Sequence, residues 1–221
     1  MFTRFALALF LASLAALPAR ADGVHDALGE LRTGNFGAAA DALDAPSKAG
    51  EIAAMNNLAF LYVVGKGVDR DLSKALDLLV PMANAGWALA QYNLGIVYST
   101  QPDILADPAA AQEIATTWFR AAAHGGHVQA QFQLGVRSYL GTGTEQDGPA
   151  SLAWLALARQ HADPALVGQI DKLILVLRKV LTDQEIQAAS TLAKAIGPTL
   201  PAPKADGVAT AQVLTTQTAG R

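Results

Sequence analysis

One motif recurs three times in a fixed register, and this recurrence restricts the fold more than any other feature of the chain. The first copy reads Asn57-Leu58-Ala59-x-x-Tyr62, and the second, 36 residues later, reads Asn93-Leu94-Gly95-x-x-Tyr98. The third copy follows after a further 40 residues as Gln133-Leu134-Gly135, with Ser138 in the place of the tyrosine. A period of this length is typical of solenoid proteins.

The residues that follow each copy repeat with the same spacings. Gly65-Lys66-Gly67 with Asp71 matches Gly141-Thr142-Gly143 with Asp147 at a shift of 76, the sum of the two shorter spacings. A shift of 40 relates Ala75, Leu78, Met82, Ala83 and Gly86 to Ala115, Trp118, Ala122, Ala123 and Gly126. Alanine-rich helices resemble one another by chance, but chance would not place glycines and aspartates in one register. The repeat is therefore real, and its middle copy carries four extra residues around 99–108.

Each copy predicts two antiparallel helices. Positions 54, 58 and 62 lie four residues apart and share one face of the first helix. The small residue at 59, 95 or 135 would let a neighbouring helix approach closely. The Gly-x-Gly turn that follows permits positive φ, which predicts the end of the first helix.

Polar residues and glycines mark the ends of the second helices. Asp71 and Asp147 are placed to cap the free backbone N–H groups at the helix start, and Asp107-Pro108 offers the same start in the middle copy. Gly86 and Gly126 are expected to end these helices in a left-handed conformation.

These motifs resemble the Sel-1-like repeat, a member of the tetratricopeptide-like helical repeat superfamily. The residues that carry the resemblance are Ala90-Gln91-x-x-Leu94-Gly95-x-x-Tyr98, Gly65-x-Gly67-Val68-x-x-Asp71 and Ala115-x-x-Trp118-Phe119-x-x-Ala122-Ala123-x-x-Gly126. The resemblance implies an all-α, right-handed α-solenoid of antiparallel helix pairs, with repeats at 51–87, 88–127 and 128–162. It also implies scaffolding or regulation of a partner complex, without a cofactor.

The segments on either side extend this architecture. Residues 22–50 look like a degenerate N-terminal repeat of helix, turn and helix. In 163–196, Asp163-Pro164 opens one helix and the capping box Thr182-x-x-Glu185 opens another, which predicts a helical C-terminal cap. From Gly197 the composition turns to Pro, Thr, Ala, Gln and Gly, and a disordered tail is expected over 197–221.

Residues 1–21 have the three-part organisation of a secretory signal peptide. A positive charge at Arg4 precedes the apolar run Phe5–Leu17, and Ala19-Arg20-Ala21 is a small-x-small cleavage site. The alternative is a membrane anchor, but thirteen residues span roughly 20 Å as a helix, short of the ~30 Å hydrocarbon core. We therefore expect an exported protein, periplasmic or secreted, with no membrane insertion after cleavage.

Composition excludes several kinds of function. The formal charge of −3 lacks the positive excess that is typical of nucleic-acid-binding proteins, so nucleic acid is not expected as a partner. Cysteine is absent, which excludes disulfides, a thiol nucleophile and zinc–thiolate sites. No nucleophile elbow, HExxH motif or other hydrolase signature occurs, so the sequence predicts no enzyme.

Two patterns suggest metal binding and are better explained otherwise. His124-x-x-His127 has spacing that suits one helix face, but Gly125 and Gly126 lie between the histidines and no third ligand is near. We interpret this segment as a solvated loop between repeats. Asp69-Arg70-Asp71 offers two acids, but the other ligands of a calcium-binding loop are missing. We interpret it as a turn followed by a helix cap. No metal is expected.

The first helices of such repeats would line a concave face that holds a protein or peptide. By the resemblance, the lining positions are Asn56, Phe60, Val63, Tyr92, Ile96, Ser99, Phe132, Val136 and Tyr139. The alternative is that several of these side chains pack between repeats. The predicted function is a non-catalytic interaction scaffold or adaptor in the bacterial envelope. The alternative function is a non-catalytic regulatory subunit of an envelope hydrolase that acts on cell wall or peptides.

Overall fold

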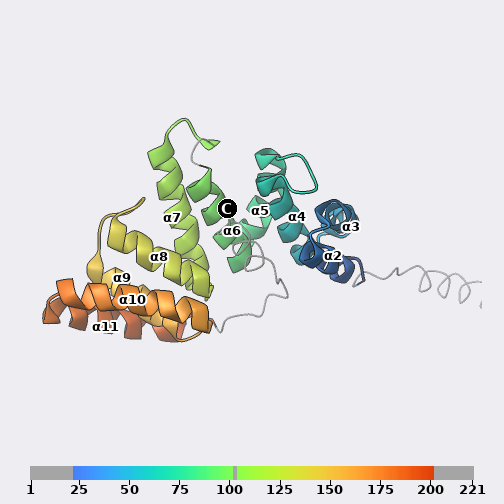
Figure 1. The fold of residues 1–221 in the computed structure, drawn as a ribbon. Helices are drawn as coiled ribbons and strands as arrows, with labels where there is room; N and C mark the ends of the chain where they lie inside the picture. Colours follow the sequence, from blue (N-terminus) through green and yellow to red (C-terminus); the bar gives the residue numbers. More distant parts are fainter. Residues whose placement is uncertain (1–21, 102–103, 202–221) are drawn as a thin grey trace, which may run out of the picture. The chain divides into compact units, whose positions relative to one another are not determined.

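A computed structural model of the chain describes residues 22–101 and 104–201 (Figure 1). Regular secondary structure in these two ranges is entirely helical, in agreement with the predicted all-α class. The chain divides into two compact units, one reaching Ala75 and the other beginning at Leu76. The predicted signal peptide at 1–21 and residues 202–221 of the expected tail lie outside the described residues.

The first unit consists of helices joined by short turns. Its elements are α2 (Asp22–Thr33), α3 (Phe36–Lys48), α4 (Ile52–Val64) and the start of α5 (Leu72–Asn84). Helix α3 packs against both α2 and α4. The turn after α4 approaches the start of α3 so closely that a Cβ on Gly67 would lie 2.2 Å from the carbonyl of Phe36. Only glycine fits there.

The second unit continues the alternation of helices and turns. Its elements are the rest of α5, then α6 (Ala88–Thr100), α7 (Pro108–His124), α8 (Val128–Leu140), α9 (Gly148–Arg159), α10 (Pro164–Val180), α11 (Asp183–Ile196) and the 3₁₀ turn η2 (Gly197–Thr199). Successive helices from α6 to α10 pack on one another, and α11 packs on α9. The glycine turns after α7 and α8 therefore each fold the next helix back onto its predecessor.

Small residues permit the close helix contacts, as the sequence predicted. A Cβ on Gly95 of α6 would lie 2.6 Å from the Phe119 ring of α7. At Gly135 of α8 a Cβ would lie 2.8 Å from Leu155 of α9. There the hydroxyl of Ser151 also donates to the Gly135 carbonyl at 2.7 Å. These contacts hold the two helices of a pair together.

The predicted helix caps are confirmed. Side chains of Asp71, Asp107, Asp147 and Asp163 each accept a hydrogen bond from a backbone N–H in the first turn of the following helix. Thr182 and Glu185 form the expected capping box at the start of α11. The caps satisfy N–H groups that would otherwise lack partners, and so they fix where each second helix begins.

One side-chain contact recurs at the joint between successive repeats. The Gln91 amide donates to the carbonyl of Ala83 at 3.0 Å, and the Gln131 amide donates to the carbonyl of Ala123 at 3.3 Å. The second bond is the first displaced by 40 residues. In each case the amide bridges the glycine turn, joining the new helix to the end of the preceding one.

The core of the second unit consists of two clusters. The first contains Tyr92, Ala115, Phe119, Ala122, Ala123, Ala130, Leu134, Trp154 and Leu157. The second contains Leu152, Ala153, Leu155, Ala158, Ile170, Leu177 and Ala189. Helix α9 contributes to both, so it joins the repeats to the C-terminal helices. The outer face of α10 is less polar than a capping helix requires, since Leu175 is 58% exposed and Val180 is 65% exposed.

The structure differs from the sequence interpretation just after α11. The composition places Gly197–Pro201 in the disordered tail, whereas Gly197–Thr199 forms η2 and Leu200 packs against the first cluster. A proline- and threonine-rich composition indicated mobility there. It did not reveal that a single leucine could anchor the segment.

Candidate functional site

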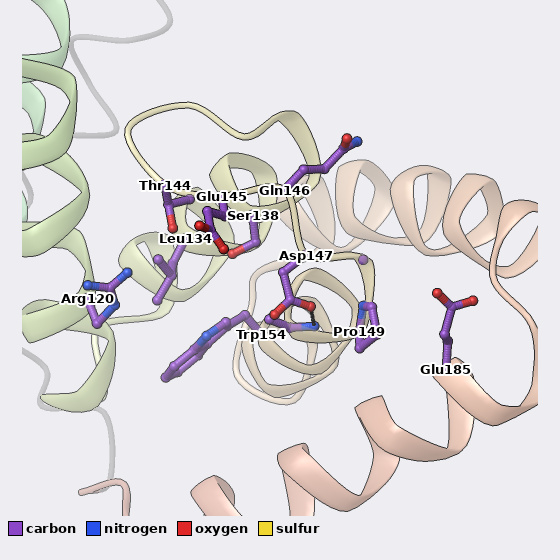
Figure 2. A pocket seen from close by; sticks show the side chains of 12 residues that line it. Arg120, Leu134, Ser138, Thr144, Glu145, Gln146, Asp147, Pro149, Trp154 and Glu185 are labelled. Carbon is purple, nitrogen blue, oxygen red and sulfur yellow. Dashed lines mark hydrogen bonds between the residues drawn. The ribbon is translucent and has the colours of Figure 1, made fainter. Parts of the chain in front are cut away.

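A polar groove with an apolar floor opens between helices of the second unit (Figure 2). Its volume is about 530 Å³. The floor comes from the buried side chains of Leu134 and Trp154, and Arg120 lies on the same side as the indole (Figure 2). Lining residues also come from the turn before α9 and from α11: Thr144, Glu145, Gln146, Asp147, Gly148, Pro149, Ala150 and Glu185. Ser138 of α8 completes the lining.

The groove carries three carboxylates and one guanidinium. Asp147 accepts from Ala150 N at 2.8 Å and so caps α9. Glu185 accepts from the backbone N–H and the hydroxyl of Thr182, each at 2.8 Å, and these bonds lower the pKa of its carboxyl. Both acids therefore serve as helix caps. Glu145 and Arg120 are exposed at the rim, available to a partner.

The lining chemistry suits binding better than catalysis. Ser138 is the one buried hydroxyl of the lining, and the lining holds no histidine or lysine to accept its proton. The lowered pKa of the Glu185 carboxyl makes it a poor proton donor. Across residues 22–101 and 104–201, no group of three His, Cys, Asp or Glu side chains could hold a metal ion.

Sequence reasoning missed this groove because its charged residues are distant in the chain. Arg120 comes from α7 and belongs to no recognised motif, while Glu185 of α11 belongs to a capping box that indicated only a helix start. Trp154 gave a partial signal, since it continues the repeat pattern set by Trp118. That pattern indicated that Trp154 packs between helices, and it gave no indication that the indole would form the bottom of a groove.

The structure places the predicted concave positions in three settings. In the first unit Asn56 is buried, while Phe60 and Val63 are half-buried. In the second unit Tyr92 belongs to the first cluster, and Ile96 packs against it. Phe132 and Tyr139 pack against the second cluster, beside α9 and α10, and Val136 is half-buried. The contacts of Tyr92, Ile96, Phe132 and Tyr139 are those of packing between helices.

The interpretation of His127 as a solvated loop residue is wrong. Its Nδ1 accepts from Ala130 N at 3.3 Å and caps α8, and its ring stacks on that of Tyr92. Burial lowers its pKa to about 4. His124 is exposed, and its ring meets Trp154 edge-on at 5.1 Å between centroids. The two histidines thus serve aromatic packing.

Arg137 is a buried cation that sequence reasoning did not single out. Its guanidinium donates to the Gln112 side chain at 2.9 Å and to the Thr116 hydroxyl at 3.0 Å. It also donates to the carbonyls of Gln112 and Thr142, and lies 5.0 Å from the centroid of the Phe119 ring. Burial lowers its pKa. The side chain ties α8, α7 and the glycine turn together, which is a structural role.

Antiparallel helix pairs in one register define an α-helical repeat protein. The Sel1 repeat family model matches residues 52–87, 88–127 and 128–163, and the chain belongs to this family. Sel1 repeats are generally protein–protein interaction modules, and their fold is typically a non-catalytic scaffold.

One solved structure supports the same fold. A Sel1 repeat protein from Oxalobacter formigenes aligns with a TM-score of 0.56 and 23% sequence identity, over 81% of this chain and 79% of that protein. This likeness confirms the solenoid class. A protective antigen of uropathogenic Escherichia coli strains, which displays an SLR fold, aligns with a TM-score of 0.41 and 23% identity, over 83% of this chain and 44% of that one. A search of curated proteins gives no match.

Among the described residues, every helix is too short or too polar to cross a bilayer.

Proposed function

We propose that this chain is an exported adaptor that holds a segment of a partner protein in the groove of Figure 2. One observation carries the proposal: an apolar floor of Leu134 and Trp154 lies beneath a rim where Arg120 and Glu145 are exposed. Apolar floors with charged rims are the usual anatomy of protein interfaces. Export rests on the signal-peptide pattern of residues 1–21.

Rigid support favours the groove as a binding site. Asp147 and Glu185 fix the starts of α9 and α11, and Arg137 fixes α8 against α7. A pre-organised groove loses little conformational entropy on binding, so it can hold a partner with few contacts. The exposed rim charges would select the partner by complementary charge.

Site-specific photo-crosslinking in the exporting cell tests this proposal. A photoreactive residue at Glu145 should give one dominant adduct, identified by mass spectrometry. The same residue at Gln187, exposed on α11 and outside the groove lining, should not give that adduct. Absence of an adduct at 145, or equal adducts at both positions, would contradict the assignment. A hydrolase as the adduct would favour the regulatory-subunit alternative over a scaffold.

Two exposed rim variants refine the same experiment. Arg120→Glu and Glu145→Lys each reverse a charge on an exposed side chain, so neither is expected to disturb the core. For each variant, recovery of the partner by affinity capture should fall by about tenfold.

Export is tested by N-terminal sequencing of the exported protein. The sequence should begin at Asp22, and an intact Met1 in the membrane fraction would contradict export.

A further inference from the structure

The chain does not leave the protein surface where α11 ends. The amide of Leu200 donates to the carbonyl of Gly197 at 3.2 Å, and the Thr199 hydroxyl donates to the carbonyl of Ile196 at 2.7 Å. These bonds close the turn η2 and direct Leu200 onto the first cluster. Leu200 itself is extended, with φ −78° and ψ 134°, which is the polyproline II region that the following Pro201 favours.

The next residue covers a glycine turn that is open elsewhere in the unit. Gly86 and Gly126 occupy equivalent places in successive repeats and have φ of 88° and 81°. A Cβ on Gly86 would meet nothing within 4 Å, whereas a Cβ on Gly126 would lie 2.6 Å from the carbonyl oxygen of Pro201. The extended segment therefore lies against one particular joint, and the absence of a side chain at Gly126 is what lets it approach.

The surface around this joint is aromatic. His127, which follows Gly126 in the chain, stacks on Tyr92, and His124, which precedes it, meets Trp154 edge-on. Trp154 and Leu134 belong both to the first cluster and to the lining of the groove in Figure 2. The place occupied by Leu200 is thus connected to the proposed binding groove through two shared side chains. Aromatic-lined surfaces are the usual receptors of extended, proline-containing segments.

We propose that this aromatic joint is a binding site for an extended Leu-Pro segment of the partner, and that the chain's own Leu200-Pro201 occupies it in the absence of that partner. The proposal rests on the proposed function and names the kind of segment that the groove accepts. A partner segment displaces Leu200 and Pro201 and takes over their contacts.

Release of the segment leaves the C-terminal helices intact. Leu200 is half-buried and Pro201 is exposed, so few contacts are lost. Helix α11 keeps its own core contacts, because Ala189 belongs to the second cluster and Ile186 and Leu192 pack against it. Three residues separate Ile196 from Leu200, and so short a tether gives the internal segment an effective concentration on the order of millimolar. A competing peptide must exceed that concentration unless the internal segment is released.

Nuclear magnetic resonance of the full-length protein tests the proposal. The probe is a synthetic peptide of residues Gly197–Pro203, and the reporter is the indole N–H signal of Trp154, assigned with Trp154→Phe. Leu200→Asp releases the internal segment. Pro198→Asp is the matched control, since it adds the same charge two residues earlier and leaves Leu200 in place. Gly126→Ala, paired with Gly86→Ala, is added to Leu200→Asp and alters the joint without altering the segment further.

The peptide should shift the Trp154 signal in Leu200→Asp with a Kd at least tenfold lower than in the unmodified protein or in Pro198→Asp. Gly126→Ala added to Leu200→Asp should raise the Kd relative to Gly86→Ala added to Leu200→Asp, because the new Cβ meets the proline of the peptide as it would meet Pro201. A peptide with aspartate in place of Leu200 should have no effect. Equal Kd values in all variants, an unmoved Trp154 signal in Leu200→Asp at millimolar peptide, or equal effects of the two peptides would overturn the proposal. The crosslinking adduct at Glu145 would still form in that case, so the two proposals fail separately.

Discussion

The imidazole of His127 stacks on the ring of Tyr92, with centroids 4.4 Å apart and 20° between the planes. The same imidazole accepts a hydrogen bond at Nδ1 from the backbone N–H of Ala130. Because Nδ1 must be unprotonated to accept, the cap exists only with neutral histidine. Burial acts in the same direction and lowers the pKa to about 4, from 6.5 in an exposed histidine.

The stability of the protein should fall as pH is lowered from about 6.5 to about 4. In this window the unfolded chain binds a proton at His127 and the folded chain does not, so acid favours unfolding. The contribution should reach at most about 3 kcal/mol in the free energy of unfolding and should not vary with pH above 6.5. Urea denaturation at a series of pH values measures it. His127→Asn keeps a side-chain cap that does not titrate, and its curve should be flatter in that window. Identical slopes for both proteins would rule out this role.

Gly143→Ala should be far more destabilising than Gly141→Ala. Both glycines have positive φ, 63° and 70°, so each substitution costs about 1 kcal/mol of backbone strain. A Cβ on Gly143 would also lie 2.1 Å from the carbonyl oxygen of Gln112, whereas a Cβ on Gly141 meets nothing closer than 3.5 Å. We expect a loss of more than about 3 kcal/mol for Gly143→Ala, measured by chemical denaturation. Equal losses at the two positions would show that the turn does not press on α7.

Phe132→Ala should reduce stability by about 2–3 kcal/mol, because Phe132 packs against the second cluster. Leu94→Ala, at a fully buried position, is the reference and should cost about 3–4 kcal/mol. Denaturation curves of the two variants decide the matter. Substitutions at exposed positions usually change the free energy of unfolding by less than about 0.5 kcal/mol. If the free energy of unfolding of Phe132→Ala differs from that of the unmodified protein by no more than this, then Phe132 lies free on a binding face.

Arg137→Met should lower the free energy of unfolding by roughly 2 kcal/mol. Methionine fills much of the same space but leaves the acceptor Gln112 Oε1 without its donor, whereas Thr142 O keeps the Thr116 hydroxyl. Arg137→Lys should also be destabilising, because one ammonium cannot reproduce the geometry of the guanidinium. Thermal and urea unfolding measure both effects. A Met variant as stable as the unmodified protein would mean that the desolvation cost of the cation cancels its hydrogen bonds.

Local signals allowed most of the fold to be predicted from sequence. Aspartates such as Asp147 and Asp163 act within one helical turn, so their positions alone mark where α9 and α10 begin. Gly95 and Gly135 indicated close helix approach because only a missing Cβ allows it. In each case the causal interaction lies within a few residues or recurs in register.

The candidate site was not predictable in the same way. Tyr92 and His127 come from opposite ends of the repeat 88–127, and a histidine in a glycine turn gives no sign of its ring partner. Arg120, Glu145 and Glu185 gather in the groove only after α7, α9 and α11 have packed. Leu200 lies in a composition typical of mobile tails, yet one half-buried side chain anchors it. Such contacts depend on tertiary packing, which residue spacing does not encode.

The hydrogen bond from Gln91 to Ala83 recurs as the bond from Gln131 to Ala123, so two successive repeats are joined to their predecessors in the same way. A joint that uses the same atoms at each occurrence does not depend on how many units precede it. Gene duplication of residues 88–127 would therefore insert a unit whose two ends both fit their neighbours. Evolution can lengthen such a chain by whole units without redesigning its interior, and an engineer can do the same.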